Sequence, residues 1–195
     1  SKDGPIHVTK NGGKKWINVT PKNIDSGGRV DCVEPSVHKK SKAYVAIIRN
    51  QLGDSKPYIY KTTNYGKDWK LLTNGNNGIP SGHPTRVVRE DPEKEGVLYA
   101  GTEFGVFVSF NDGENWEPFQ QNLPVTPVTD LKVFRGDLII STMGRGFWIL
   151  DNVSSLNETD NIANDNHLFK PRDAFRYRYR ASKGNSVPKY PGPSV

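Results

Sequence analysis

One octapeptide pattern, Ser/Thr-x-Asn-x-Gly-x-x-Trp, occurs three times in this chain of 195 residues and constrains its fold more than any other feature. Asparagine can hydrogen-bond its own backbone, and glycine takes a positive φ without steric cost, so each copy predicts a tight turn. The tryptophans recur about every 50 residues, a period typical of a supersecondary unit repeated around an axis. The pattern residues are Thr9, Asn11, Gly13 and Trp16, then Thr62, Asn64, Gly66 and Trp69, then Ser109, Asn111, Gly113 and Trp116.

The segments around these turns have the composition of short strands. The run at 43–48 is nearly all apolar, as expected for a strand buried on both faces. A fourth copy of the pattern is degenerate, because Asn152 is kept but Ser154 replaces the glycine, which is typical of a terminal repeat. Strands are predicted at 5–9, 16–20, 29–33, 43–48, 58–62, 69–72, 85–88, 97–100, 106–109, 116–119, 128–134, 137–141 and 147–150.

The three turns are similar to Asp-box repeats, the β-hairpin turns of bacterial sialidases, xyloglucan-cleaving glycoside hydrolases, photosystem assembly factors and sortilin-type receptors. The usual aspartate is asparagine in all three copies. A second signature, Gly101–Ser109 followed by Ser141–Asp151, resembles the last blades of large bacterial sortilin-like propellers, which are often classed with glycoside hydrolases. The resemblance implies an all-β fold of four-stranded antiparallel β-propeller blades, in which the twelve pattern residues are scaffold.

About three and a half blades are predicted over residues 1–153, followed by an irregular extension at 154–195 with one basic-aromatic strand at 168–180. Propellers have four to eight blades, and an open one would expose aggregation-prone edge strands. We therefore expect this chain to be the C-terminal part of a larger propeller, closed by the remaining blades of a longer chain or by another chain. The proline-rich end is expected to lead to a further domain.

The net charge of +6 is concentrated from residue 170 onward, where Phe175-Arg-Tyr-Arg-Tyr-Arg180 alternates aromatic with basic side chains. A phosphate-binding protein usually spreads its basic groups over a folded face, so nucleic acid is not an expected partner. An edge strand with one solvated face is the favoured interpretation, and a nucleic-acid or membrane patch is the alternative. No apolar run is long enough to cross a bilayer. The single cysteine, Cys32, is expected to be a small buried side chain.

Few residues suggest catalysis. The four histidines lack metal-ligand spacing, and neither a nucleophile elbow nor a phosphate loop occurs, so no cofactor is expected. Glycoside hydrolysis requires two carboxylates about 5–10 Å apart. In a propeller, the loops between the second and third strands, and those between blades, build the ligand face, where Asp54, Glu103 and Asp130 are expected. The structural alternative for Glu103 is an ion pair or backbone acceptor that holds its loop.

Three arginines come from successive units, Arg29, Arg86 and Arg145, and could converge on a substrate carboxylate as in sialidases. The alternative is that the first two simply flank inner strands. The leading hypothesis is a non-catalytic recognition segment that binds a peptide, protein or glycan through Glu103, Phe104, Arg145 and Arg49. A glycoside hydrolase with catalytic carboxylates partly outside this chain is the second hypothesis, and a structural module is the third. An extracytoplasmic location is implied by the resemblance alone.

Overall fold

The computed structural model describes residues 4–22, 24, 27–161, 168, 169, 171 and 173. These residues form thirteen strands and two short 3-10 helices. The strands are β1 (His7–Val8), β2 (Ile17–Asn18), β3 (Arg29–Pro35), β4 (Ala43–Ile48), β5 (Ile59–Thr62), β6 (Lys70–Leu71), β7 (Thr85–Glu90), β8 (Leu98–Thr102), β9 (Gly105–Ser109), β10 (Glu117–Pro118), β11 (Val128–Phe134), β12 (Asp137–Thr142) and β13 (Phe147–Leu150); the helices are η1 (Asn50–Leu52) and η2 (Val153–Asn161).

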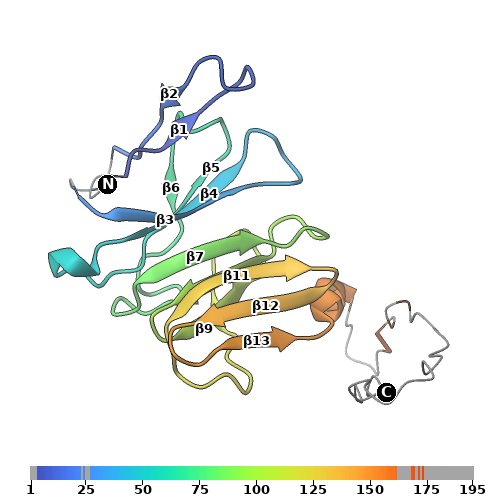
Figure 1. Cartoon of the computed structure of the whole chain (residues 1–195). Helices are drawn as coiled ribbons and strands as arrows, with labels where there is room; N and C mark the ends of the chain where they lie inside the picture. The colour runs from blue at the N-terminus through green and yellow to red at the C-terminus, as the bar shows by residue number, and fades with distance from the viewer. Residues whose placement is uncertain are drawn as a thin grey trace, which may run out of the picture.

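The strands pair antiparallel, in chain order, into four separate sheets (Figure 1). We call β1–β2 blade 1, β3–β6 blade 2, β7–β10 blade 3 and β11–β13 blade 4. Blades 2 and 3 have four strands each, blade 4 has three and blade 1 has two. The chain is therefore all-β and consists of about three and a half β-propeller blades, which confirms the predicted fold class and the order of its strands.

The inner strand of each larger blade carries the same irregularity. The pairing register shifts between Val30 and Cys32 in β3, between Thr85 and Val87 in β7, and between Val128 and Asp130 in β11. A β-bulge leaves one extra residue and redirects its side chain. Asp31, Arg86 and Thr129 are these extra residues, so three consecutive blades direct a polar side chain from the same position.

The three repeat turns, residues 9–16, 62–69 and 109–116, share one hydrogen-bond arrangement. In the second turn, Gly66 N donates to Thr62 Oγ1 at 2.9 Å and Asp68 N donates to Asn64 Oδ1 at 3.0 Å. The first and third turns form the corresponding bonds at 2.9–3.0 Å. Gly66 has a φ of 80°, and Gly13 and Gly113 have 87° and 85°. Because these bonds span two to four residues, the turn is encoded locally, as the sequence pattern predicts.

The core lies between the blades. One cluster joins blades 2, 3 and 4 through fully buried side chains such as Tyr44, Leu98 and Leu138, and Cys32 belongs to it as expected. A second, smaller cluster joins blade 1 to blade 2 around Val45 and Tyr60. Burying these faces against one another is the main stabilising contribution in such a fold.

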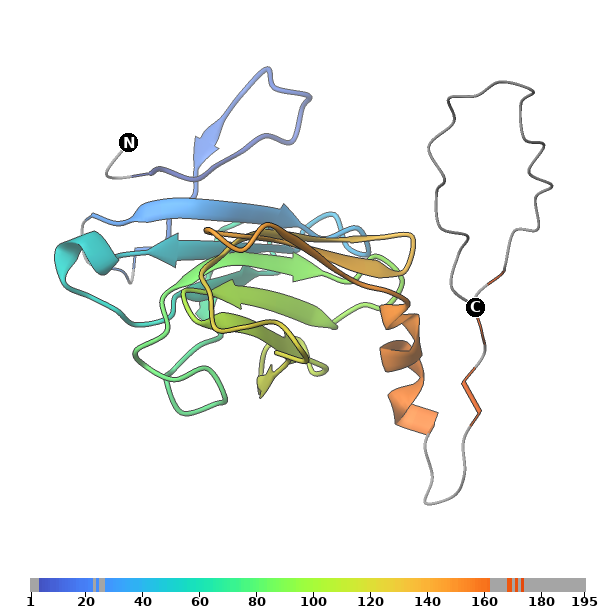
Figure 2. The same cartoon turned by 60° about the horizontal axis from the view of Figure 1, so that its bottom comes forward.

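Helix η1 and the loops next to it lie at one end of the molecule, and η2 lies at the opposite end (Figures 1 and 2). Val153, at the start of η2, is buried in the core, so this helix spans the predicted boundary at residue 153. The predicted basic-aromatic strand at 168–180 lies mostly outside the described residues, and its four described members, Leu168, Phe169, Pro171 and Asp173, belong to no strand. Within the described part of the chain, no helix is long and apolar enough to cross a membrane.

Candidate functional site

A depression of about 440 Å³ lies at the η1 end of the molecule, where loops of blades 2, 3 and 4 meet. The β4–β5 loop, the β8–β9 turn and the segments before β7 and β11 all contribute to it. This is the face that the sequence predicts for ligand binding, and we call it the loop face. The depression is lined by Asn50, Ser55, Gly82, Pro84, Glu103, Phe104, Val125, Thr126 and Pro127.

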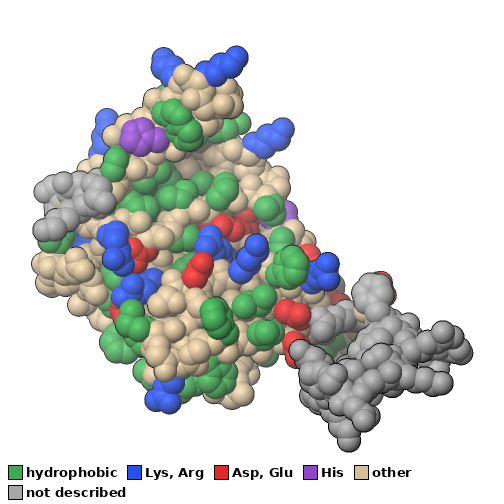
Figure 3. Space-filling view, in the orientation of Figure 1, with side chains coloured by type: hydrophobic (Ala, Val, Ile, Leu, Met, Phe, Trp, Pro, Cys, Tyr) green, Lys and Arg blue, Asp and Glu red, His purple; other side chains and the backbone are tan. Residues whose placement is uncertain are grey.

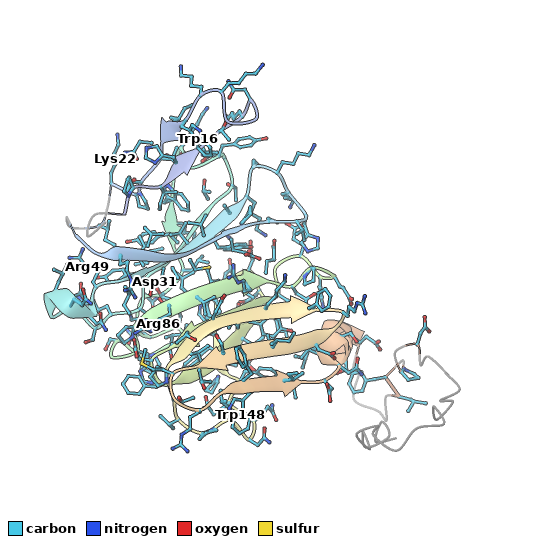
Figure 4. All side chains as sticks on the ribbon, viewed as in Figure 1. Trp16, Lys22, Asp31, Arg49, Arg86 and Trp148 are labelled. Carbon is cyan, nitrogen blue, oxygen red and sulfur yellow. The ribbon has the colours of Figure 1, made fainter. Side chains whose placement is uncertain are left out.

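Glu103 is held by a chain of charges that begins on the inner strand of blade 2. Arg86 Nε donates to Glu103 Oε1 at 2.7 Å, and Arg86 Nη1 lies 3.7 Å from Asp31 Oδ2. Arg29 Nη2 in turn donates to Asp31 Oδ2 at 3.0 Å. Figure 4 shows Asp31 and Arg86 on adjacent inner strands, near the end where Arg49 lies. The ion pair is the arrangement that the structural alternative for Glu103 describes, since it joins the β8–β9 turn to the inner strand of blade 3.

Phe104 follows Glu103 in the turn and is 46% exposed at the depression. Its ring packs against the imidazole of His83, with the two ring centroids 4.7 Å apart. His83 also contacts Phe107 edge-on, with the centroids 6.0 Å apart. Burial lowers the pKa of His83 and favours the neutral imidazole. His83 Nδ1 is buried without a hydrogen-bond partner. This support could not be predicted from the sequence, because the role of His83 depends on its packing against Phe104.

Arg49, a predicted ligand-face residue, is 7% exposed. Its Nε lies 3.1 Å from Asp54 Oδ2 and its Nη1 donates to the carbonyl of Gly27. Tyr58 donates to the same carboxylate oxygen at 2.7 Å. Burial opposes the charged form of Asp54, but the bonds from Tyr58, the Lys56 amide and Arg49 outweigh it and lower its pKa. Burial and Asp54 together raise the pKa of Tyr58 to about 12. Arg49 therefore braces the β4–β5 loop that borders the depression.

Arg145 lies in the β12–β13 turn with an exposed side chain, and its carbonyl accepts a hydrogen bond from Trp148 Nε1 at 3.0 Å. The start of the same turn joins the depression, because Met143 N donates to Pro127 O at 2.9 Å. Arg29 and Arg86 both contact the Asp31 carboxylate. Among the described residues, no contact links Arg145 to either of them. Arg145 is thus exposed in the turn that contacts Pro127, whereas Arg49 and Arg86 are held by carboxylates of blades 2 and 3.

The carboxylates near the depression are all engaged. Asp31 and Glu103 pair with arginines, Asp54 pairs with Arg49, and Asp130 pairs with Arg89 at 2.8 Å. A general acid requires a raised pKa, whereas the pKa of Asp54 is lowered. Within the described residues, no group of three His, Cys, Asp or Glu side chains could hold a metal ion. The chemistry that the site offers is apolar contact over Phe104, Val125 and two prolines, with amide and hydroxyl groups at the rim.

No family model matches the sequence, and no curated protein matches it. Solved structures do resemble the fold. They include YCF48 bound to D1 peptide, at 16% identity and a TM-score of 0.56, covering 77% of this chain and 46% of that one. The GH74 xyloglucanase from Xanthomonas campestris is 17% identical with a TM-score of 0.56, covering 75% and 24%. The GH74 enzyme of Niastella koreensis is 14% identical with a TM-score of 0.50, covering 63% and 21%. These likenesses show the β-propeller fold, and the chain spans less than half of each of these proteins.

Proposed function

We propose that this chain is the non-catalytic recognition segment of a larger Asp-box β-propeller of the sortilin-like type, from an extracytoplasmic bacterial protein. It binds a peptide or a peptide segment of a protein through the loop face, and a glycan is the other ligand class compatible with the rim. In this proposal residues 1–153 are the propeller segment and 154–195 lead to a further domain. The observation that carries it is the half-exposed Phe104, fixed over an apolar depression by His83 and by the Arg86–Glu103 ion pair.

The composition of the depression favours a peptide over a sugar. Phe104, Pro84 and Pro127 offer apolar contact to a side chain, while Asn50 and Ser55 can hydrogen-bond a peptide backbone. Aromatic residues in desolvated pockets are where binding energy concentrates in protein interfaces. Arg145, exposed in the β12–β13 turn that contacts Pro127, adds a cation that favours an acidic residue in the ligand. The structural neighbour YCF48, whose structure contains a bound peptide, supports the same ligand class.

Additional blades are part of this proposal because two sheet faces carry unusually exposed apolar side chains. Phe147 is 81% exposed, Ile149 62% and Phe134 50%, all on blade 4, and green apolar side chains gather over that blade in Figure 3. At the other end of the array, Trp16 on blade 1 is 59% exposed. Contiguous exposed apolar surface of this kind marks an interaction site. A further blade packed on each of these two faces would bury the exposed side chains, as the faces of blades 2 and 3 are buried in this structure.

The test is a selection of phage-displayed peptides on the full-length protein, repeated on the Phe104→Ala variant. Val37→Ala is the control, since Val37 is exposed and lies in the loop between β3 and β4, away from the residues that line the depression. We expect selected peptides to bind Phe104→Ala at least about tenfold more weakly, as for an interface anchor, and to bind the control unchanged. Peptides that bind all three proteins equally would overturn the proposal.

A glycoside hydrolase remains the second candidate, favoured by the two GH74 structural neighbours. It predicts that the full-length protein releases reducing ends from xyloglucan and that Glu103→Gln abolishes the release. Recognition without catalysis predicts no release by either protein. Because Glu103 is paired with Arg86, the same substitution is expected to loosen the Phe104 turn and weaken peptide binding instead.

A further inference from the structure

Two consecutive grooves between the outer parts of the blades are built from corresponding residues. Trp69 Nε1 donates to Val19 O at 2.6 Å, and one blade further along Trp116 Nε1 donates to Leu72 O at 3.3 Å. In each case the acceptor follows the tryptophan of the preceding repeat turn by three positions. The match extends further, because the Gly66 backbone lies against the Val19 side chain just as that of Gly113 lies against Leu72.

The chain fills the groove between blades 2 and 3 with its own loop, residues 74–79. Asn77 Nδ2 donates to Leu72 O at 2.7 Å and to Glu114 O at 3.0 Å, and Asn77 O accepts from Trp116 N at 2.8 Å. The next residue, Gly78, has a φ of 114°, and a Cβ there would lie 1.7 Å from Trp116 O. An asparagine followed by glycine is therefore what this groove accepts.

The equivalent groove between blades 1 and 2 has a volume of about 480 Å³, and no segment among the described residues fills it; we call it the open groove. Ten positions separate Thr20 from Val30 here, against twelve between the corresponding Thr73 and Thr85. The groove is lined by Ile17, Asn18, Val19, Thr20, Lys22, Gly66, Lys67, Asp68 and Trp69.

The backbone groups that hydrogen-bond Asn77 in the filled groove have counterparts in the open groove. The Lys67 carbonyl corresponds to that of Glu114, and the Trp69 backbone N–H corresponds to that of Trp116. Neither group has a hydrogen-bond partner among the residues that the structure describes. Val19 O accepts the Trp69 indole, whereas Leu72 O accepts both an indole and an amide. Backbone groups that lack a partner within the described residues are available to a ligand that supplies these bonds.

We propose that this open groove is a second binding site, which takes a polypeptide segment of a partner protein presenting asparagine followed by glycine. The asparagine amide donates to Val19 O and Lys67 O, and its backbone carbonyl accepts from Trp69 N. The glycine passes the Trp69 carbonyl, where a side chain would not fit. Lys22 and Lys67 outnumber the one carboxylate at the wall of the groove, Asp68, and favour acidic residues beside this pair. The site is independent of the loop face, so either proposal can fail without the other.

The probe is the protein's own plug as a synthetic acetylated peptide, residues 73–80, Thr-Asn-Gly-Asn-Asn-Gly-Ile-Pro. Titrated into the full chain and followed by NMR, it is expected to shift the indole and backbone N–H signals of Trp69 in a saturable way. Trp116 is the internal control, because its groove is already filled. Peptides carrying Asn77→Leu or Gly78→Ala are expected to bind at least about tenfold more weakly, since each loses bonds or gains a clash.

A variant of the chain itself provides a second test. Replacing residues 21–26 by residues 74–81 supplies the plug covalently and keeps Gly27 and Arg29, which contact Arg49 and Asp31. The variant is expected to lose peptide binding and to unfold at a higher temperature than the parent. Equal binding of the Asn77→Leu peptide would overturn the proposal, and so would the absence of Trp69 shifts at millimolar peptide. Both outcomes are read on the parent chain, so they do not depend on whether the replacement variant folds.

Discussion

The guanidinium of Arg86 and the carboxylate of Asp31 lie 3.7 Å apart on adjacent inner strands, and each residue is the extra residue of a β-bulge. The two bulges direct the side chains toward each other across the junction of blades 2 and 3. Through Arg86 the same contact reaches Glu103 and so fixes the turn that carries Phe104. The shape of the candidate site therefore depends on a strand irregularity in the centre of the fold.

Replacing Asp31 by asparagine is expected to destabilise the chain. The change leaves Arg29 and Arg86 without their shared carboxylate, and because Asp31 and Arg86 are only 12% and 16% exposed, water replaces it poorly. We expect a loss of about 1–2 kcal/mol in the free energy of unfolding, measured by urea denaturation. Glu117→Gln, at an exposed position of β10, is the control and should change it by less than about 0.5 kcal/mol. Equal effects of the two substitutions would contradict the role given to Asp31.

Two glycines of the repeat turns should respond differently to the same substitution. Gly113 has a φ of 85° and its added Cβ would lie 2.5 Å from Leu72 Cδ1, whereas Gly13 has a φ of 87° but meets only Trp16 at 4.0 Å. Gly13→Ala carries the backbone cost alone, about 1–2 kcal/mol, and Gly113→Ala adds about 1–3 kcal/mol of steric overlap. Thermal unfolding of the two variants measures the difference. A larger effect at Gly13 would show that the blade contact at Gly113 is not tight.

Acid should weaken the contact between blades 2 and 3 on the side away from the loop face. Asp112 Oδ2 lies 2.8 Å from Lys61 Nζ, while Asp112 Oδ1 lies 3.1 Å from Lys42 Nζ and accepts from the Tyr44 hydroxyl at 2.5 Å. Burial opposes the charge, but the bonds from Lys61, Tyr44 and Lys42 prevail and lower the pKa of Asp112 below its ordinary 3.8.

A carboxylate whose pKa is lower in the folded state stabilises the fold above its unfolded-state pKa, and this contribution disappears as the pH falls through the folded value. The free energy of unfolding of the wild type should therefore exceed that of Asp112→Asn near neutral pH, and the gap should shrink below about pH 4. Chemical denaturation between pH 7 and pH 3 measures this gap. A gap that stays constant with pH would mean that the Asp112 charge contributes nothing.

The repeat turns could be predicted from sequence because their hydrogen bonds connect residues two to four positions apart, as in Gly66 to Thr62. Strand order followed from the same repeat. The loop face was harder, because Arg49 was expected to meet a ligand and instead is buried against Asp54 and the carbonyl of Gly27. Burial of that kind depends on how a loop folds back, which a linear pattern does not specify.

Contacts between blades were also beyond the sequence pattern. Arg86 and Glu103 were each recognised as conspicuous, but their pairing and the support of Phe104 by His83 require the distance between two loops. The open groove beside Trp69 required a comparison of what fills two equivalent grooves. Each repeat turn is determined by neighbouring residues and can be predicted from the sequence. Both candidate sites are formed by residues that are distant in the sequence and meet only when the blades pack together.

Peptide binding at the loop face can be located without any substitution by amide hydrogen exchange of the full-length protein with a peptide selected on it. We expect slower exchange in residues 50–55, 82–84, 102–105 and 124–127, which surround the depression at the loop face. Protection confined to the open sheet face of blade 4, residues 128–150, with no change around Phe104, would contradict binding at the loop face.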